Sequence, residues 1–166
     1  MEPSRVFVDG ALEGRVAIVT GGGTNLGKAA AAELARCGAL VLIAGRRAEI
    51  LEAAAAELGE RCSWVVGDIR ERAGAEQIVA TALERFGRVD LVLNNAGGQY
   101  MVPAEGLTTK GWRAVQRLNV DGTLAMCKAA YDLAMRDAGA GTMSTSPSRP
   151  ITACRQWRTP APRGPP

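Results

Sequence analysis

Val16-Ala-Ile-Val-Thr20 runs directly into Gly21-Gly-Gly-Thr-Asn-Leu-Gly27, and these two consecutive segments decide the fold. An unbroken apolar, β-branched run that stops at a glycine cluster is typical of a strand buried on both faces of a parallel sheet. Glycines at that point let the backbone approach a pyrophosphate, and the helix that follows offers unpaired N–H groups and a positive dipole at its first turn. Taken alone, the cluster is equally compatible with a flexible turn.

The same alternation of short apolar runs and helical stretches continues to residue 136. Glycines close several of the helical stretches, as C-cap glycines do. The expected strands are 16–20, 39–45, 63–66 and 89–93, and the expected helices are 26–37, 48–58, 71–86 and 108–136. The side chains available for burial in the last helix are Trp112, Val115, Leu118, Leu124, Cys127 and Leu133. This order predicts an α/β fold, a Rossmann-type doubly wound parallel sheet with helices on both faces.

Several classes of chemistry are excluded by composition. Histidine is absent, which excludes a Ser-His-Asp triad, a histidine general base and histidine metal ligands. Cys37, Cys62, Cys127 and Cys154 form no Cys-x-x-Cys pair, so we expect packed, reduced thiols rather than a zinc site or disulfides. No apolar run approaches the roughly 18 residues of a membrane helix, and the first residues lead into no signal-peptide stretch. We therefore expect a cytoplasmic protein with no metal and no membrane contact.

The charge distribution changes abruptly near residue 141. Residues 1–141 carry a net charge of −1, whereas residues 142–166 carry four arginines, no acid and six of the eight prolines. This break predicts a folded dinucleotide-binding domain over 1–141 and a disordered Pro/Arg-rich tail over 142–166. Because the basic excess lies in the tail, it gives no reason to expect nucleic-acid binding by the folded part.

Two arginines follow the second expected strand. In parallel sheets of this kind, ligands bind past the carboxyl ends of the strands, and the residue after the second strand contacts the ribose of a dinucleotide. An acid there holds the 2′-hydroxyl of NAD, and an arginine accommodates the 2′-phosphate of NADP. Here Arg46 and Arg47 follow Gly45, with no acid at that position. The alternative, a solvated pair of charges at a helix start, is disfavoured by the helix dipole. The pair therefore predicts NADP rather than NAD.

The chain resembles the short-chain dehydrogenase/reductase family over roughly residues 12–142. The resemblance rests on four motifs in the same order as in that family. They are Gly14-Arg-Val-Ala-Ile-Val-Thr-Gly21 with Gly27, Gly67-Asp68-Ile69, Asn94-Asn95-Ala96-Gly97, and Asn119 within Leu118-Asn-Val-Asp-Gly122. Within the family, Gly98-Gln-Tyr-Met-Val-Pro-Ala-Glu105 and Lys110-Gly-Trp112 are most similar to peroxisomal trans-2-enoyl-CoA reductases and their bacterial relatives.

The resemblance implies an NADP(H)-dependent oxidoreductase that acts on a small-molecule substrate such as an acyl-CoA, in a homo-oligomeric parent protein. It also implies a role for each residue that matches a family motif. Gly21, Asn25, Leu26 and Gly27 would line the pyrophosphate, Arg46 and Arg47 would meet the 2′-phosphate, Asp68 and Ile69 would meet the adenine, Asn95, Ala96 and Gly97 would steady the cofactor, and Asn119 would anchor a proton-relay water at a helix kink.

Two departures from the family pattern affect binding and catalysis. Asn25 replaces the middle glycine of the first motif, although asparagine tolerates left-handed backbone angles better than most residues. The family's Tyr-x-x-x-Lys pair is missing, because the residues four positions after Tyr100 and Tyr131 are alanine and methionine. The polar context of the serines between 144 and 148 is unlike the family's fifth strand, so none is assigned as the catalytic serine. We therefore expect this chain to be inactive.

A one-base frameshift near codon 143 would explain the composition break. With GC-rich codons, reading from the last base of the Met143 codon encodes Val-Asn-Val-Thr-Leu-Ser-Pro, which begins like the family's fifth strand. Two alternatives to an oxidoreductase remain open at this point. One is a non-catalytic dinucleotide-binding module or fragment, and the other is a methyltransferase-like fold that binds an adenosyl cofactor through Gly67-Asp68.

Overall fold

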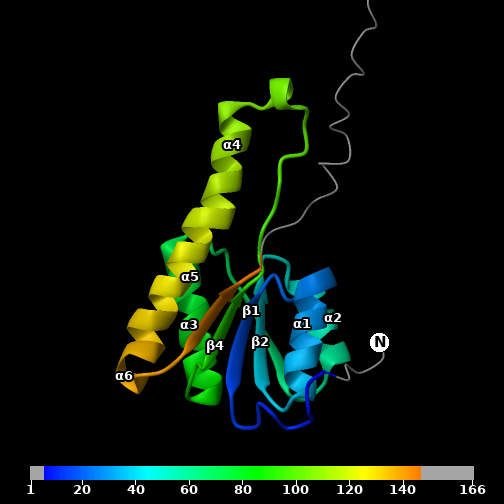
Figure 1. Ribbon diagram of the computed structural model, residues 1–166, viewed down its shortest axis with the longest axis vertical. Helices are drawn as coiled ribbons and strands as arrows, with labels where there is room; N and C mark the ends of the chain where they lie inside the picture. The colour runs from blue at the N-terminus through cyan, green and yellow to red at the C-terminus, as the bar shows by residue number, and fades with distance from the viewer. Residues whose placement is uncertain (1–5, 147–166) are drawn as a thin grey trace, which may run out of the picture.

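The computed structural model describes residues 6–146, which form a five-stranded parallel sheet covered by helices on both faces (Figure 1). The strands lie in the order β3-β2-β1-β4-β5, so the chain starts in the middle of the sheet and winds outward to both sides. Their bounds are β1 Val16–Thr20, β2 Leu40–Gly45, β3 Cys62–Val66, β4 Leu91–Asn94 and β5 Thr142–Thr145. The expected doubly wound α/β fold is therefore confirmed.

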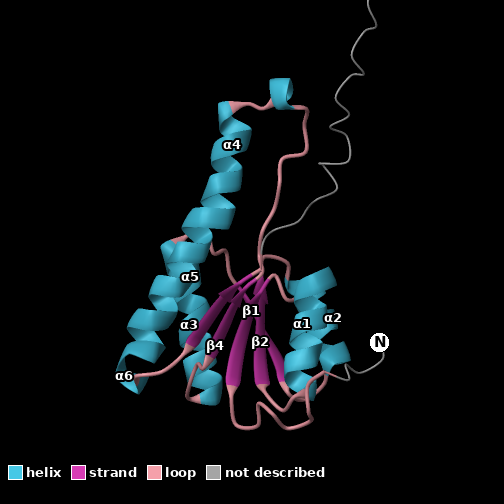
Figure 2. Cartoon of the chain, in the orientation of Figure 1, coloured by secondary structure: helices cyan, strands magenta, loops and turns pink. Residues whose placement is uncertain are grey.

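Helices connect the strands and divide between the two faces of the sheet (Figure 2). Helices α1 and α2 cover one face, and α3 with the long helical segment after β4 covers the other. The bounds are α1 Asn25–Arg36, α2 Ala48–Leu58, α3 Arg72–Phe86, η1 Ala104–Gly106, α4 Thr109–Gln116, η2 Arg117–Asp121, α5 Gly122–Ala130, η3 Tyr131–Met135 and α6 Arg136–Ala138.

Alternating side chains of the strands build two separate apolar cores. Ile18 of β1 and Leu42 of β2 face α3 and α5, where they meet Met126. Val19 and Ile43, one residue further along each strand, face α1 and α2. Both strands are buried on both faces, which explains their unbroken apolar sequence. Burying a side chain of this size stabilises the fold by about 1.5–3 kcal/mol.

The first of two corrections to the sequence-based predictions concerns the start of the tail. Thr142–Thr145 were expected to be disordered, but they form β5, which pairs in parallel with β4. All four residues of β5 are exposed, so the strand is held by backbone hydrogen bonds rather than by apolar burial. One of these runs from the Thr142 N–H to the Asp90 carbonyl at 2.8 Å. The composition of a segment says little about such pairing, which is why the prediction was wrong. The rest of the tail, 147–166, lies outside the described residues.

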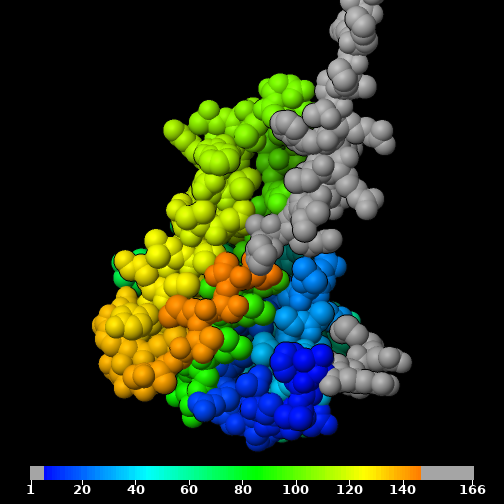
Figure 3. All heavy atoms as spheres, viewed as in Figure 1, coloured from blue at the N-terminus to red at the C-terminus, as the bar shows by residue number. Residues whose placement is uncertain are grey.

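The second correction concerns the single long helix expected over 108–136. The segment is helical over this range, but two π-helical stretches, η2 and η3, interrupt it. Trp112, Leu124 and Leu133, which were available for burial, are each about half exposed, at 53%, 57% and 47%. Small residues and Met126 make the buried contacts instead. In Figure 3 the start of this segment stands above the body of the domain.

Two further expectations concern membranes and thiols. Within residues 6–146, no helix is long and apolar enough to cross a bilayer.

Cys37 is buried and Cys62 and Cys127 are partly buried, and all three are free thiols. Burial raises the pKa of the Cys62 thiol to about 11, so this thiol stays protonated near neutral pH. Cys154 lies outside the described residues.

Candidate cofactor site

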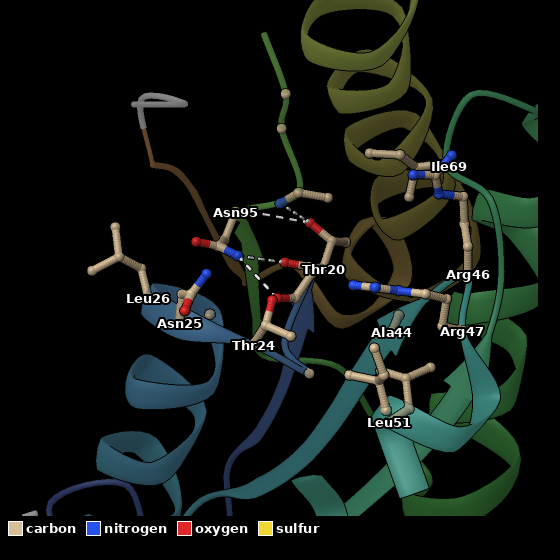
Figure 4. A pocket seen from close by; sticks show the side chains of 18 of the residues that line it. Thr20, Thr24, Asn25, Leu26, Ala44, Arg46, Arg47, Leu51, Ile69 and Asn95 are labelled. Atoms are coloured by element: carbon tan, nitrogen blue, oxygen red, sulfur yellow. Dashed lines mark hydrogen bonds between the residues drawn. The ribbon is translucent and has the colours of Figure 1, made fainter. Parts of the chain in front are cut away.

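A cavity of about 700 Å³ lies at the carboxyl ends of β1, β2, β3 and β4 (Figure 4). This is the place where parallel α/β sheets bind ligands, because the strand order reverses there on either side of β1. Every residue that the sequence predicts for cofactor binding lines this cavity. These residues are Gly21, Asn25, Leu26, Gly27, Arg46, Arg47, Asp68, Ile69, Asn95, Ala96 and Gly97.

The loop between β1 and α1 forms one wall of the cavity. Gly21 has a φ of 65° and Asn25 a φ of 46°, so the turn uses left-handed geometry where the family pattern has a glycine. A Cβ atom on Gly27 would overlap the carbonyl oxygen of Gly21 and the side-chain amide of Asn95. Thr24 makes no side-chain cap on α1, so it leaves the first N–H groups of this 12-residue helix without a side-chain acceptor. A helix N-terminus whose first N–H groups have no side-chain acceptor attracts anions.

A second strand end is tied to this loop by hydrogen bonds. The Asn95 side-chain amide donates to the carbonyl oxygens of Thr20 at 3.0 Å and Gly21 at 3.3 Å. In return, the Thr20 hydroxyl accepts from the N–H groups of Asn95 at 3.1 Å and Ala96 at 3.0 Å. The ends of β1 and β4 therefore hold each other in place at the floor of the cavity.

Two guanidinium groups stand opposite the glycine loop. Arg46 and Arg47 leave the end of β2 and extend over the cavity in Figure 4. Both are exposed, and within residues 6–146 neither forms an ion pair. The positive charge of Arg46 contributes to the lowered pKa of Asp68, but no carboxylate in the described part of the chain binds either side chain directly. Their donors are therefore available to an anionic group of a ligand.

Asp68 and Ile69 follow β3 and form the next part of the wall. Ile69 is 5% exposed and packs under the cavity. The Asp68 carboxylate accepts hydrogen bonds from both the backbone and the guanidinium of Arg70, the first of them at 3.0 Å. These bonds outweigh desolvation and lower the pKa of Asp68 below its ordinary value of 3.8, so the group is ionised near neutral pH.

Asn119 lies beside the cavity rather than in its wall. Its side chain bonds both polar groups of Gly98: Nδ2 donates to the Gly98 carbonyl at 2.7 Å and Oδ1 accepts from the Gly98 N–H at 3.0 Å. Asn119 belongs to the π-helical stretch η2, an irregularity of the kind often found at functional sites. The resemblance implies a helix kink at Asn119, and the structure has this π-helical stretch there. The side chain of Asn119 fixes the segment that follows β4.

The sequence reasoning missed several residues of the site. Thr20 was quoted within the first motif but was given no role in the site, and the structure shows that it is buried, at 1% exposure. A hydroxyl residue between an apolar run and a glycine cluster is the sequence signal that could have found it. Ser146, directly after β5, also lines the cavity. Neither Tyr100 nor Tyr131 does so, and their side chains are 48% and 50% exposed. The described residues therefore place no tyrosine at the cavity.

A model of the short chain dehydrogenase family matches residues 15–145 of this sequence. The chain belongs to the short-chain dehydrogenase family. This membership removes the methyltransferase-like alternative, because the shared motifs and the cavity are those of an NAD(P)-binding fold.

Individual relatives agree with this assignment. The chain is 33% identical over 127 residues to a peroxisomal 2,4-dienoyl-CoA reductase of Arabidopsis thaliana, covering 75% of this chain and 43% of the relative. It is 40% identical over 113 residues to an NADP-dependent (R)-specific alcohol dehydrogenase of Lentilactobacillus kefiri, covering 67% and 45%. A solved citronellol catabolism dehydrogenase of Pseudomonas aeruginosa PAO1 matches with 34% identity and a TM-score of 0.78, covering 84% and 58%. The chain spans about half the length of the curated relatives it matches.

Proposed function

We propose that this chain is the cofactor-binding part of an NADP(H)-dependent oxidoreductase and that it binds NADP(H) in the cavity described above. The observation that carries the proposal is the pair Arg46 and Arg47, which have no ion-pair partner among residues 6–146 and line the same cavity as the glycine loop. The name of the NADP-dependent relative from Lentilactobacillus kefiri supports the same cofactor.

The residues present fit a dinucleotide at each of its charged parts. Gly27 lies so close to the carbonyl of Gly21 that a side chain at position 27 would not fit. Without a side chain there, the pyrophosphate can lie against the backbone and the first turn of α1. Arg46 and Arg47 would hold the 2′-phosphate, and Asp68 with Ile69 would hold the adenine. Asn95 would steady the cofactor from the end of β4. When bound, the cofactor supplies a hydride to the substrate.

The substrate belongs to the proposal as well. The name of the plant relative supports an enoyl or carbonyl thioester such as an acyl-CoA as the substrate of the whole protein. We keep for Asn119 the proposed role of anchoring a relay water, which its place in η2 supports. The 166 residues contain no Tyr-x-x-x-Lys pair, so we propose that this chain binds cofactor without turnover. The cytoplasmic location and the homo-oligomeric parent protein stay predictions.

A non-catalytic dinucleotide-binding module is the second candidate function, favoured by the absence of a tyrosine at the cavity among the described residues. The two candidates predict the same binding and differ in turnover by the whole protein. Consumption of NADPH in the presence of an enoyl thioester, by a version of the protein that carries the family's complete active site, would favour the oxidoreductase. Binding without consumption in that version would favour the module.

A fluorescence titration with NADPH tests binding at this cavity. Gly27→Ala should reduce the affinity at least tenfold, because the added methyl group overlaps backbone and side-chain atoms that cannot all move away. Gly106→Ala is the matched control, because a Cβ there meets only ordinary contacts at 3.8 and 3.9 Å, far from the cavity. Equal NADPH affinity in the unmodified chain and in Gly27→Ala would contradict the assignment of the site.

A further inference from the structure

Arg70 donates hydrogen bonds to the carboxylate of Asp68 from its backbone N–H, its Nε and its Nη2. The Arg70 backbone N–H donates to Oδ1 at 3.0 Å, and Nε donates to Oδ1 at 2.9 Å and to Oδ2 at 3.0 Å. Nη2 completes the arrangement with a bond to Oδ2. Asp68 lines the cavity and Arg70 does not, so the arginine holds the carboxylate from outside the ligand space.

The backbone around Asp68 is fixed independently of this pair. A Cβ on Gly74 would overlap the Asp68 carbonyl oxygen, so the first turn of α3 packs directly on this peptide group. Ile69 packs against Gly122 of α5, where a Cβ would lie 2.9 Å from the isoleucine side chain. Glu71 is ion-paired with Arg117 of η2. These contacts hold the backbone of residues 68–71, so the Asp68 carboxylate can move mainly by rotation of its side chain. The hydrogen bonds from Arg70 restrict that rotation.

We propose that Arg70 is a positioning residue that holds Asp68 as an adenine-specific acceptor for the cofactor. This inference rests on the proposed function. The single Nε–H of Arg70 lies between the two oxygens and is shared by them, so its two contacts count as one hydrogen bond. A carboxylate offers about four lone-pair sites, and the three N–H groups of Arg70 therefore leave acceptor capacity for one more donor. The amino group of a 6-amino purine is such a donor, and the oxygen of a 6-oxo purine is not. Because an ionised carboxylate cannot donate, the pair selects adenine over hypoxanthine.

The charges around Asp68 keep this acceptor ionised. Arg70 on its own segment and Arg46 from the end of β2 both favour the carboxylate. Glu71 is the adjacent acid, and Arg117 of η2 is paired with it. The bonds from Arg70 are the largest contribution to the lowered pKa of Asp68. Removing them would allow protonation at a higher pH, and a protonated carboxyl accepts the adenine amino group less well.

The experiment compares NADPH with its hypoxanthine analogue in titrations of the full chain. The unmodified chain should prefer NADPH about tenfold or more, since a bond to a charged acceptor contributes about that factor. Arg70→Ala should weaken NADPH binding about tenfold, leave the hypoxanthine analogue nearly unchanged, and raise the pH below which NADPH binding is lost. Arg70→Lys should restore part of the preference. Arg72→Ala is the control, because it removes a neighbouring arginine whose ion pair with Glu76 lies on the surface of α3.

Different outcomes address the two proposals separately. If the unmodified chain binds neither nucleotide, the proposed function fails. If it binds NADPH but Arg70→Ala keeps the full preference for adenine, the role of Arg70 is overturned. An equal loss of affinity for both nucleotides in Arg70→Ala, without partial rescue by Arg70→Lys, would show a purely structural role and would also overturn the proposal.

Discussion

The side-chain amide of Asn95 donates a 3.0 Å hydrogen bond to the carbonyl oxygen of Thr20, 75 residues earlier in the chain. The Thr20 hydroxyl accepts two backbone N–H groups from the same segment, at 3.1 and 3.0 Å. The ends of β1 and β4 therefore satisfy each other's polar groups at a place where neither strand continues. This exchange leaves the cavity with a rigid floor against which a ligand can be oriented.

Replacing the Thr20 hydroxyl should destabilise the fold. Thr20→Val keeps the shape of the side chain at a position that is 1% exposed, but it removes the hydroxyl that accepts from the Ala96 N–H. The Asn95 N–H loses the same acceptor and keeps its second one, the Leu93 carbonyl at 3.0 Å. An unsatisfied buried group costs about 1–3 kcal/mol, so we expect the free energy of unfolding to fall by about that amount in urea denaturation. Thr81→Val, which removes a hydroxyl bonded to Gln77 on the surface of α3, should change it by less than about 0.5 kcal/mol. Equal effects of the two substitutions would contradict this account.

The acid stability of the domain should depend on Asp90. Burial alone would raise the pKa of this carboxyl, but hydrogen bonds from Arg88, the Val16 N–H and Arg15 lower it from 3.8 to about 2. Because the folded pKa is the lower one, the carboxylate stabilises the fold above about pH 4, and this contribution is lost as the pH falls toward 2.

Unfolding curves measured at several pH values test this dependence. Asp90→Asn should lower stability at pH 7 and flatten the decline between pH 4 and pH 2. Asp137→Asn, on the exposed α6, should follow the curve of the unmodified chain. A decline in Asp90→Asn as steep as in the unmodified chain would argue against this role of Asp90.

Self-association should involve the exposed apolar side chains of the helical segment from α4 to η3. Trp112, Val120, Leu124 and Tyr131 are each about half exposed on this segment, a concentration of apolar surface typical of contacts between proteins. The strand β5 also presents an unpaired edge among the described residues. We expect Leu124→Glu to shift the chain toward monomer in sedimentation velocity, and Val8→Glu, at a residue that is 74% exposed near the start of the chain, to leave it unchanged. If the unmodified chain and both variants were all monomeric, the prediction would be contradicted.

Most of the sheet and the first three helices could be predicted because their side chains carry the signal. The apolar runs of β1 and β2 are buried on both faces, and Gly87 ends α3 with a left-handed φ of 76°. The strand β5 could not be predicted in the same way, because its pairing uses backbone groups and its side chains are exposed. The π-helical stretches likewise change the hydrogen-bond spacing without an evident mark in the side-chain pattern.

In the candidate site too, some features could be predicted from the sequence and others could not. The glycine loop, the arginines after β2 and Asp68 follow strand ends, and parallel strands bring their carboxyl ends to one edge of the sheet. The bonds of Arg70 to Asp68 depend on side-chain torsions, which sequence spacing does not specify. The exposure of Leu124 has a different origin: the helix carries apolar residues on more than one face, and the pattern alone does not indicate which face packs on the sheet.

The frameshift hypothesis predicts a specific result at the gene. The structure places β5 over Thr142–Thr145, the same part of the chain where the alternative reading frame encodes a β-branched run. Independent sequencing around codon 143 should find one base gained or lost relative to the frame that encodes the Pro/Arg-rich tail. An unchanged frame in several independent reads would show that the Pro/Arg-rich tail is encoded as given.

The central claim, that Arg46 and Arg47 hold the 2′-phosphate of NADP(H), is tested most directly by the ratio of NADH to NADPH dissociation constants. Loss of a charge-assisted contact costs about 1.5–3 kcal/mol, which corresponds to a ratio of about 10–150 in favour of NADPH in the unmodified chain. Arg46→Asp should erase or invert this preference, whereas Arg113→Asp, which makes the same charge change on the exposed part of α4, should preserve it. Equal affinities for NADH and NADPH in the unmodified chain would contradict the account.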